Sequence, residues 1–208
     1  MSTQRRQFTA FSRVLHWTMA AMVLTMLCIG VAMVASLANY HVLMSIHRPL
    51  GIAILVLVLV RFVNRLLNPP PPFPATMSHV ERLAATASEL LMYGLMFALP
   101  LVGWGMLSAA HYPIVLFGPL RLPYILPHNV MLYAVLRQAH TVLAYLFFLT
   151  FLAHFAAILF HTLIVRDGIL KRMAPWNIRP KEASFTEPNR PQAGRENIFA
   201  PTARENQR

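Results

Sequence analysis

The chain has 208 residues, of which 57% are hydrophobic and only 12% are charged. An ordinary soluble domain carries about 25% charged residues, so this composition excludes a soluble enzyme and indicates an integral membrane protein. The formal net charge is +11, but the basic residues flank apolar stretches. We therefore attribute them to membrane topology and contact with membrane lipid, and we expect no nucleic-acid partner.

The hydropathy pattern predicts an all-α membrane protein with four transmembrane helices. After a polar N-terminal segment, 1–11, a four-helix domain occupies 12–176. Its predicted spans cover 12–37, 46–67, 80–109 and 138–165. The proline run at 68–74 predicts an extended linker, because proline cannot continue a helix interior. We expect 110–136 to cap one end of the bundle with a short helix at 129–136, and the polar segment 177–208 to be a disordered tail.

The fourth predicted span carries three histidines, His140, His154 and His161, among apolar residues. Ionisable side chains at membrane depth are costly and indicate function. His140 and His154 are about four helical turns apart, so they share a face and lie roughly 21 Å apart along the axis. One imidazole therefore lies near each side of a bilayer core about 30 Å thick. Two such ligands suit two haems that pass an electron across the membrane.

The distribution of basic residues predicts an orientation. With four spans, one membrane face carries only Arg48, Arg121 and Arg137, whereas the other face carries the remaining Lys and Arg residues and all seven acids. The positive-inside rule therefore places both termini in the cytoplasm. An outer face without acids attracts anions.

This topology pairs histidines from different helices. His47 and His140 both begin spans at the outer side, so they are expected to meet. His16 lies near the inner side, where its partner is His154 or, seven residues later, His161. A single histidine within a span is often only a helix-packing hydrogen bond, but a set at matched depths on three helices favours haem ligands. A zinc or copper site is the other alternative, although it would need its ligands clustered at one depth.

The chain resembles the bacterial di-haem cytochrome b-561 family, and within it superoxide oxidase-like members. The resemblance rests on SRVLHW at 12–17, IHRPLGIAILVLVLVR at 46–61, ALPLVG at 98–103, FGPLRLPY at 117–124, the histidine series and RDGILKRMAP at 166–175. It implies two haem b groups, one held by His16 with His154 and the other by His47 with His140. It also implies a quinone pocket near His161. Arg61 and Arg65 could then pair with haem propionates, although snorkelling anchors are an equal alternative.

Two functions follow from this resemblance and from the charge pattern. In the first, Arg121, Arg137 and Arg48 attract superoxide to the outer face, and its electrons pass through the two haems to ubiquinone in a bacterial inner membrane. In the second, the chain is a membrane anchor and electron relay for a partner redox subunit, a dehydrogenase or hydrogenase. A transporter is disfavoured because no span contains an acid pair or a broken-helix ion site.

Overall fold

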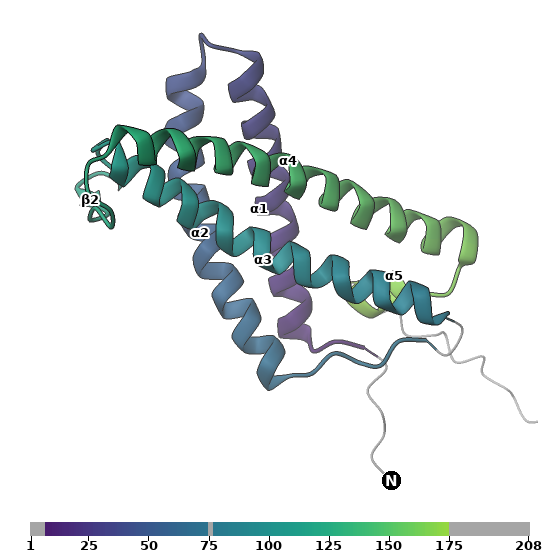
Figure 1. Cartoon of the computed structure of the whole chain (residues 1–208). Coiled ribbons are helices and arrows are strands. Elements are labelled where there is room, and N and C mark those ends of the chain that lie inside the picture. Colours follow the sequence, from purple (N-terminus) through teal and green to yellow (C-terminus); the bar gives the residue numbers. More distant parts are fainter. Residues whose placement is uncertain (1–6, 75–76, 175–208) are drawn as a thin grey trace, which may run out of the picture. The chain divides into compact units, whose positions relative to one another are not determined.

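A computed structural model describes residues 7–74 and 77–174, and these form a largely helical unit (Figure 1). The long helices are α1 (Ala10–Ala35), α2 (Tyr40–Leu67), α3 (His79–Ala109) and α4 (Val130–Phe160). The short elements are β1 (Val115–Phe117), β2 (Leu120–Arg121), the π-helix η1 (His161–Val165) and α5 (Ile169–Met173). Four helices, the fourth continuing through η1, are long and apolar enough to cross a membrane. The prediction of four spans is confirmed.

Local sequence signals fix the ends of these helices. The Thr9 side chain accepts a hydrogen bond from the Ser12 amide at the start of α1. Ser78 and Glu81 form a reciprocal capping box at the start of α3. Such caps satisfy amides that have no partner inside the helix. Helix α2 ends at Leu67, before Asn68 and the proline run, because proline disfavours helical geometry in the residue before it.

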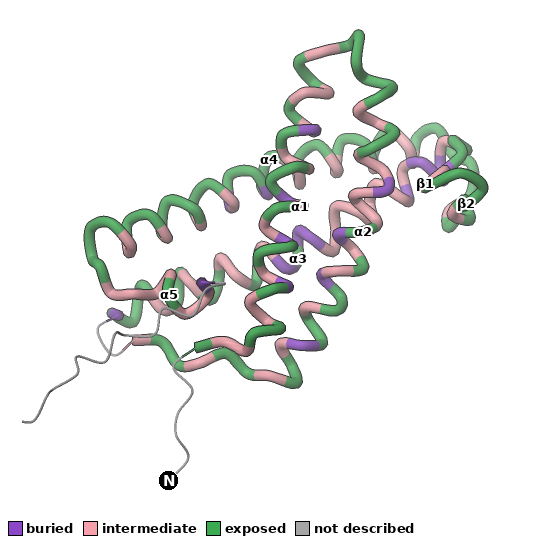
Figure 2. The backbone as a smooth tube through the Cα atoms, turned by 180° about the vertical axis from the view of Figure 1, so that it is seen from behind, coloured by how far each residue is buried: buried purple, intermediate pink, exposed green. Residues whose placement is uncertain are grey.

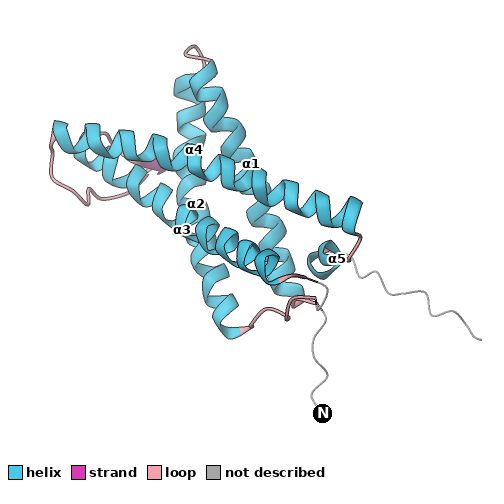
Figure 3. Cartoon of the chain, turned by 45° about the vertical axis from the view of Figure 1, so that its right-hand side comes forward, coloured by secondary structure: helices cyan, strands magenta, loops and turns pink. Residues whose placement is uncertain are grey.

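The segment between the third and fourth spans differs from the prediction in two ways. Residues 130–136 form no separate helix, since they are the first turns of α4. The Asn129 side chain caps the Leu132 amide, and no glycine or proline follows that would end the helix before residue 160. The remainder of the segment contains an antiparallel hairpin of β1 and β2 that was not predicted (Figure 3).

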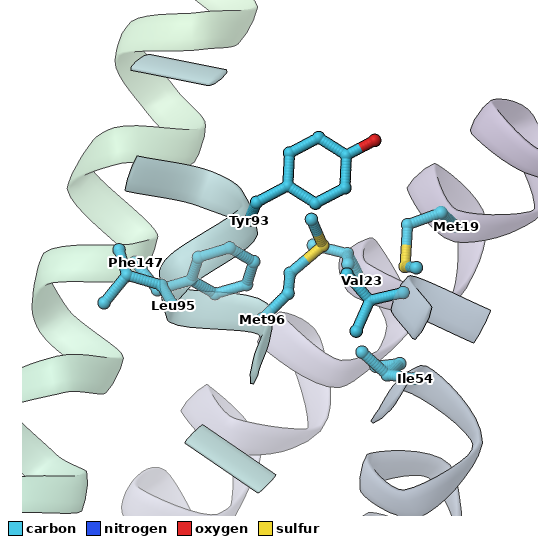
Figure 4. Close-up of a cluster of buried hydrophobic side chains, with 8 residues drawn as sticks. Met19, Val23, Ile54, Tyr93, Leu95, Met96 and Phe147 are labelled. Carbon is cyan, nitrogen blue, oxygen red and sulfur yellow. The ribbon is translucent and has the colours of Figure 1, made fainter. Parts of the chain in front are cut away.

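The long helices form two antiparallel hairpins, α1 with α2 and α3 with α4, which cross where α2 meets α3 (Figure 1). A cluster of buried apolar side chains joins all four helices (Figure 4). Its members are Met19, Val23, Ile54, Val58, Tyr93, Leu95, Met96 and Phe147. Elsewhere many residues along the helices are exposed (Figure 2), and large apolar side chains are frequent among them. This pattern suits helices whose outer surface contacts lipid.

The described part of the chain has two ends, which we name the hairpin end and the α5 end. The hairpin end contains β1 and β2, and Arg48 of α2 donates there to the Pro113 carbonyl at 3.4 Å. The α5 end contains the start of α1, where Trp17 Nε1 donates to the Met173 carbonyl at 2.8 Å. At this end Arg172 also donates to the Pro72 carbonyl at 2.6 Å. The predicted disordered tail, 177–208, lies outside the described residues.

Candidate functional site

A pair of imidazoles lies between α2 and α4 toward the hairpin end. His47 and His140 have ring centroids 6.3 Å apart, with planes inclined by 66°. A metal-bound imidazole nitrogen lies about 2 Å from its metal, so two imidazoles on opposite sides of one ion have ring centres about 6 Å apart. The observed separation suits two axial ligands of one haem iron.

An imidazole that binds iron through one nitrogen keeps a second nitrogen, which needs a hydrogen-bond partner of its own. Within the described part of the chain, Nδ1 of His47 and Nδ1 of His140 are buried and make no hydrogen bond of good geometry. His140 nevertheless lies beside the Leu99 carbonyl of α3. A ligating histidine usually donates its second N–H to a carbonyl or carboxylate, which fixes the tautomer. The Leu99 carbonyl is therefore a candidate acceptor for a ring N–H of His140.

Gly103 of α3 lies directly against the His140 ring. A Cβ atom built at Gly103 would lie 3.4 Å from Cε1 and 3.6 Å from Nδ1 of His140. Any side chain longer than a methyl group would therefore press on the imidazole. The glycine allows α3 to approach α4 closely at the height of the His47–His140 pair.

The second pair of predicted ligands lies toward the α5 end and includes an arginine. Nη1 of Arg61 lies 2.8 Å from Nδ1 of His16, and Nε of Arg61 donates to the Tyr93 hydroxyl at 2.9 Å. His154 of α4 lies within electrostatic range of both His16 and Arg61. Of the two partners that spacing allows for His16, the structure thus brings His154 near it. His161 instead contacts a carboxylate of its own segment.

The contact between Arg61 and His16 defines a tautomer. A guanidinium only donates, so Nδ1 of His16 accepts the hydrogen bond and the ring proton of neutral His16 lies on Nε2. Iron ligation through Nε2 needs the opposite tautomer, with the proton on Nδ1. The Arg61 contact and ligation by His16 Nε2 therefore exclude each other. Ligation of iron by Nε2 of His16 would require Arg61 to release His16.

Arg65 lies one helical turn beyond Arg61 but has different partners. Its guanidinium forms an ion pair with Glu89 of α3 and lies 5.9 Å from the centroid of the Tyr93 ring. Arg61 lies over the same ring at 5.7 Å. Both arginines thus face α3, which is unlike a snorkelling anchor that extends away from the protein into the interface.

His161 begins the π-helix at the α5 end of α4. Its Nδ1 lies 2.6 Å from Oδ2 of Asp167, and the two side chains are only 15% and 7% exposed. Phe160 packs edge-on against the His161 ring, with centroids 5.8 Å apart. The candidate quinone residue is therefore a largely sequestered histidine with a carboxylate partner.

The three arginines predicted to attract an anion all lie toward the hairpin end. Arg121 on β2 and Arg137 on α4 are exposed, whereas Arg48 is half-buried and bonded to the Pro113 carbonyl. Within the described residues, no hydrogen bond joins the three side chains. They provide a dispersed positive field at this end rather than one chelating site.

Sequence reasoning missed three residues of these sites. Tyr93 follows Glu89 by one helical turn, so a shared face of α3 was a readable signal. Asp167 entered the sequence analysis only within the segment 166–175, although the glycine that follows it marks a turn that can fold back. Gly103 carried no such signal, because nothing in the sequence places it opposite His140.

Comparison with known proteins identifies the family. A sequence model described as prokaryotic cytochrome b561 matches residues 7–176. The chain belongs to the prokaryotic cytochrome b561 family. It is 30% identical over 171 residues to cytochrome b561 homolog 2 of Escherichia coli (strain K12), covering 80% of this chain and 90% of that protein. A b-type cytochrome carries haem b and transfers electrons, so this chain is a bacterial membrane electron-transfer protein that binds haem b.

Two further relatives extend the comparison. The probable superoxide oxidase CybB of Yersinia pestis is 32% identical over 130 residues, which cover 62% of this chain and 73% of that protein. Cytochrome b561 homolog 1 of Escherichia coli (strain K12) is 28% identical over 142 residues, which cover 66% of this chain and 78% of that protein.

Proposed function

We propose that this cytochrome oxidises superoxide at its hairpin end and reduces ubiquinone at its α5 end. The observation that carries the proposal is the pair His47 and His140, whose 6.3 Å separation suits the axial ligands of a haem. A second haem would be held by His16 and His154. Haem, when bound, supplies reversible one-electron transfer. His47, His140, His16 and His154 would hold and orient the haem groups.

The inner haem site would require a rearrangement of Arg61. Ligation by His16 through Nε2 would break its contact with Arg61, because the ring nitrogen at Nδ1 would then carry a proton. The released guanidinium needs a new acceptor, and a haem propionate is a carboxylate that matches it. Arg65 is already paired with Glu89, so we assign the propionate contact to Arg61 first.

The charge distribution supports an orientation and a substrate. Both termini lie in the cytoplasm in this proposal, and the hairpin end faces the periplasm across the bacterial inner membrane. Superoxide is an anion, and the hairpin end offers Arg48, Arg121 and Arg137 with no acid among them. A field of one sign raises the local concentration of an opposite charge and its rate of encounter. The relative named as a probable superoxide oxidase supports the same substrate.

His161 would bind the ubiquinone headgroup. An imidazole N–H donates to a quinone carbonyl and can also transfer the proton that the reduced carbonyl oxygen needs. Two superoxide ions, one quinone and two protons would give two dioxygen molecules and one quinol. The proton uptake lies on the α5 side, where His161 is found.

The direct test uses the purified, haem-loaded protein in vesicles that contain ubiquinone. Superoxide generated outside should reduce the quinone at a rate that scales with protein, and superoxide dismutase should abolish the effect. A protein that holds both haems but gives no superoxide-dependent quinone reduction would contradict the proposal.

One feature favours a second function, the electron relay for a partner redox subunit. Apolar and aromatic side chains are exposed at the hairpin end, where they offer a docking surface. They are Tyr112, Phe117, Leu120, Tyr124 and Ile125. In that case a partner subunit should co-purify in stoichiometric amount, and quinone reduction should need the partner's donor rather than superoxide.

A further inference from the structure

The C-terminal end of α4 has unusual backbone geometry around one carboxylate. The helix widens into the π-helix His161–Val165, and Arg166 then takes a left-handed conformation with φ 56°. Left-handed conformation is uncommon for residues other than glycine, and π-helical turns occur frequently at functional sites. The Arg166 amide donates back to the His161 carbonyl at 2.7 Å. The chain thereby reverses and brings Asp167 next to the His161 ring.

The two carboxylate oxygens of Asp167 have separate partners. Oδ2 lies 2.6 Å from Nδ1 of His161, and Oδ1 accepts from the Ile169 amide at 3.1 Å. An ionised carboxylate only accepts, so the proton in the first contact lies on Nδ1 of His161. The second bond anchors the carboxylate at the start of α5. The Ile169 amide therefore fixes the Asp167 carboxylate through Oδ1, and the carboxylate in turn fixes the His161 ring through Oδ2.

We propose that Asp167 is a positioning residue that fixes His161 as the proton donor to a quinone. The inference rests on the proposed function, because it assigns a role within the quinone site. With Nδ1 occupied by the carboxylate, Nε2 is the nitrogen that exchanges a proton. The carboxylate also balances the positive charge of the protonated ring. A histidine held in this way can give its Nε2 proton to a carbonyl oxygen and keep its Nδ1 proton.

The proton balance of the step is simple. Each quinone takes up two electrons and two protons. His161 gives one proton from Nε2 to one carbonyl oxygen, becomes a neutral imidazole protonated at Nδ1, and regains its proton from water. The second proton comes from water at the other carbonyl oxygen. Asp167 contributes orientation, because its Oδ2 lies 2.6 Å from Nδ1 of His161.

The substitution Asp167→Asn separates this role from a structural one. Asparagine has one oxygen, which can still cap the Ile169 amide. Its NH₂ group then faces His161 and donates to Nδ1, so the ring proton moves to Nε2. This neutral ring still donates to a quinone carbonyl but is a poor acid. Quinone binding should therefore survive while proton delivery fails.

The experiment follows the reoxidation of haem. Protein reduced with dithionite, and freed from the excess, is mixed with a short-chain ubiquinone while the haem absorbance is recorded. For Asp167→Asn we expect the maximal rate to fall about 100-fold, with the half-saturating quinone concentration within about twofold of wild type. The solvent deuterium isotope effect on the maximal rate should rise. His161→Ala should change both the rate and the half-saturating concentration.

Glu81 offers a matched control. It is exposed, lies at the start of α3 within electrostatic range of both His161 and Asp167, and caps its own helix. Glu81→Gln makes the same change of charge, and glutamine also serves at that position of a capping box. This variant should reoxidise as fast as wild type. Equal slowing in Glu81→Gln would show that local charge, not the contact with His161, matters.

The outcomes separate the inference from the proposed function. Wild-type protein that quinone does not reoxidise, or a His161→Ala variant that behaves as wild type, overturns the quinone site itself. Slow reoxidation in His161→Ala but wild-type behaviour in Asp167→Asn overturns only the role of Asp167. If Asp167→Asn loses haem, Asp167→Ser keeps a hydroxyl to cap Ile169 and removes the acceptor for His161. Wild-type rates in Asp167→Ser would overturn the proposal equally.

Discussion

At the scale of single residues, the histidines of the spans divide into three environments. His47 and His140 face each other, His16 is bonded to Arg61, and His161 is bonded to Asp167. The 6.3 Å separation of the His47 and His140 rings suits two imidazoles that bind one iron. His16 would need Arg61 to withdraw before it could bind iron. His161 is instead held by the carboxylate of Asp167. The same side chain therefore serves different chemistry according to its partner.

The assignment of ligands predicts how haem is lost on substitution. His47→Ala should lower the haem content from two to one per chain, because one haem loses an axial ligand. His47→Ala with His140→Ala should lose the same single haem, whereas His47→Ala with His154→Ala should lose both. The haem-to-protein ratio from pyridine haemochromogen spectra measures this. A double His47→Ala, His154→Ala variant that keeps one haem would show that the histidines are paired wrongly.

The close approach of Gly103 to His140 predicts a second effect. Gly103→Val places methyl groups against the ring and should lower retention of the outer haem by about tenfold, the scale of other changes around a metal ligand. Gly94 lies on the same helix, and a Cβ there has no atom within 4 Å. Gly94→Val is therefore the control and should keep both haems. Equal haem loss in the two variants would indicate general damage to α3.

Spacing in the sequence predicts that the histidines lie at two depths, because helix geometry converts residue number into height. It left the partner of His16 open, since both His154 and His161 return to the same face. The spacing could not predict the contacts of Arg61 and Asp167. They depend on which helices adjoin, and on a chain reversal in which Arg166 takes a left-handed conformation that its residue type does not favour.

At the scale of elements, the four spans were predictable because long apolar runs are unambiguous, whereas their boundaries were less so. Helix α2 begins at Tyr40 and carries Pro49 within it, although the expected start was residue 46. Helix α4 absorbs the expected short helix at 129–136. The β1–β2 hairpin is only three and two residues long, which is too short for an alternating pattern to reveal it.

Helix α5 is held to α1 by a hydrogen bond that can be tested alone. Trp17→Phe removes the donor to the Met173 carbonyl but keeps an aromatic ring. It should cost about 0.5–1.5 kcal/mol and accelerate amide hydrogen exchange over residues 166–174 by up to about tenfold. Mass spectrometry of exchanged peptides measures the change.

The hairpin end supplies the control for this prediction. Trp104 Nε1 donates to the Pro123 carbonyl at 2.9 Å, so Trp104→Phe is the same chemical change at the other end. It should leave exchange over 166–174 unaltered and accelerate exchange near Pro123 instead. Faster exchange over 166–174 in both variants would mean that α5 responds to global stability and not to Trp17.

At the scale of the whole molecule, the distribution of basic residues predicts the orientation. The test removes the single thiol by Cys28→Ser and introduces cysteine singly as Leu37→Cys, Pro119→Cys or Phe73→Cys. A membrane-impermeant maleimide added to spheroplasts should label the first two, which lie in the α1–α2 turn and the β1–β2 hairpin. Phe73→Cys in the proline linker should react only after lysis. The reverse pattern would invert the molecule and remove the basis for a periplasmic substrate.

The field at the hairpin end gives the last prediction, since it acts through the sum of charges and not through one contact. Replacing Arg48, Arg121 and Arg137 together with glutamine should lower the rate of superoxide oxidation about tenfold at low ionic strength, because steering of an anion depends on the opposite field. At about 1 M salt the Debye length falls to about 3 Å, so the wild-type and variant rates should converge. Lys171→Gln, which changes charge at the α5 end, is the control and should leave the salt dependence unchanged. A triple variant whose rate is lower by the same factor at every ionic strength would point to local damage at these residues and away from steering.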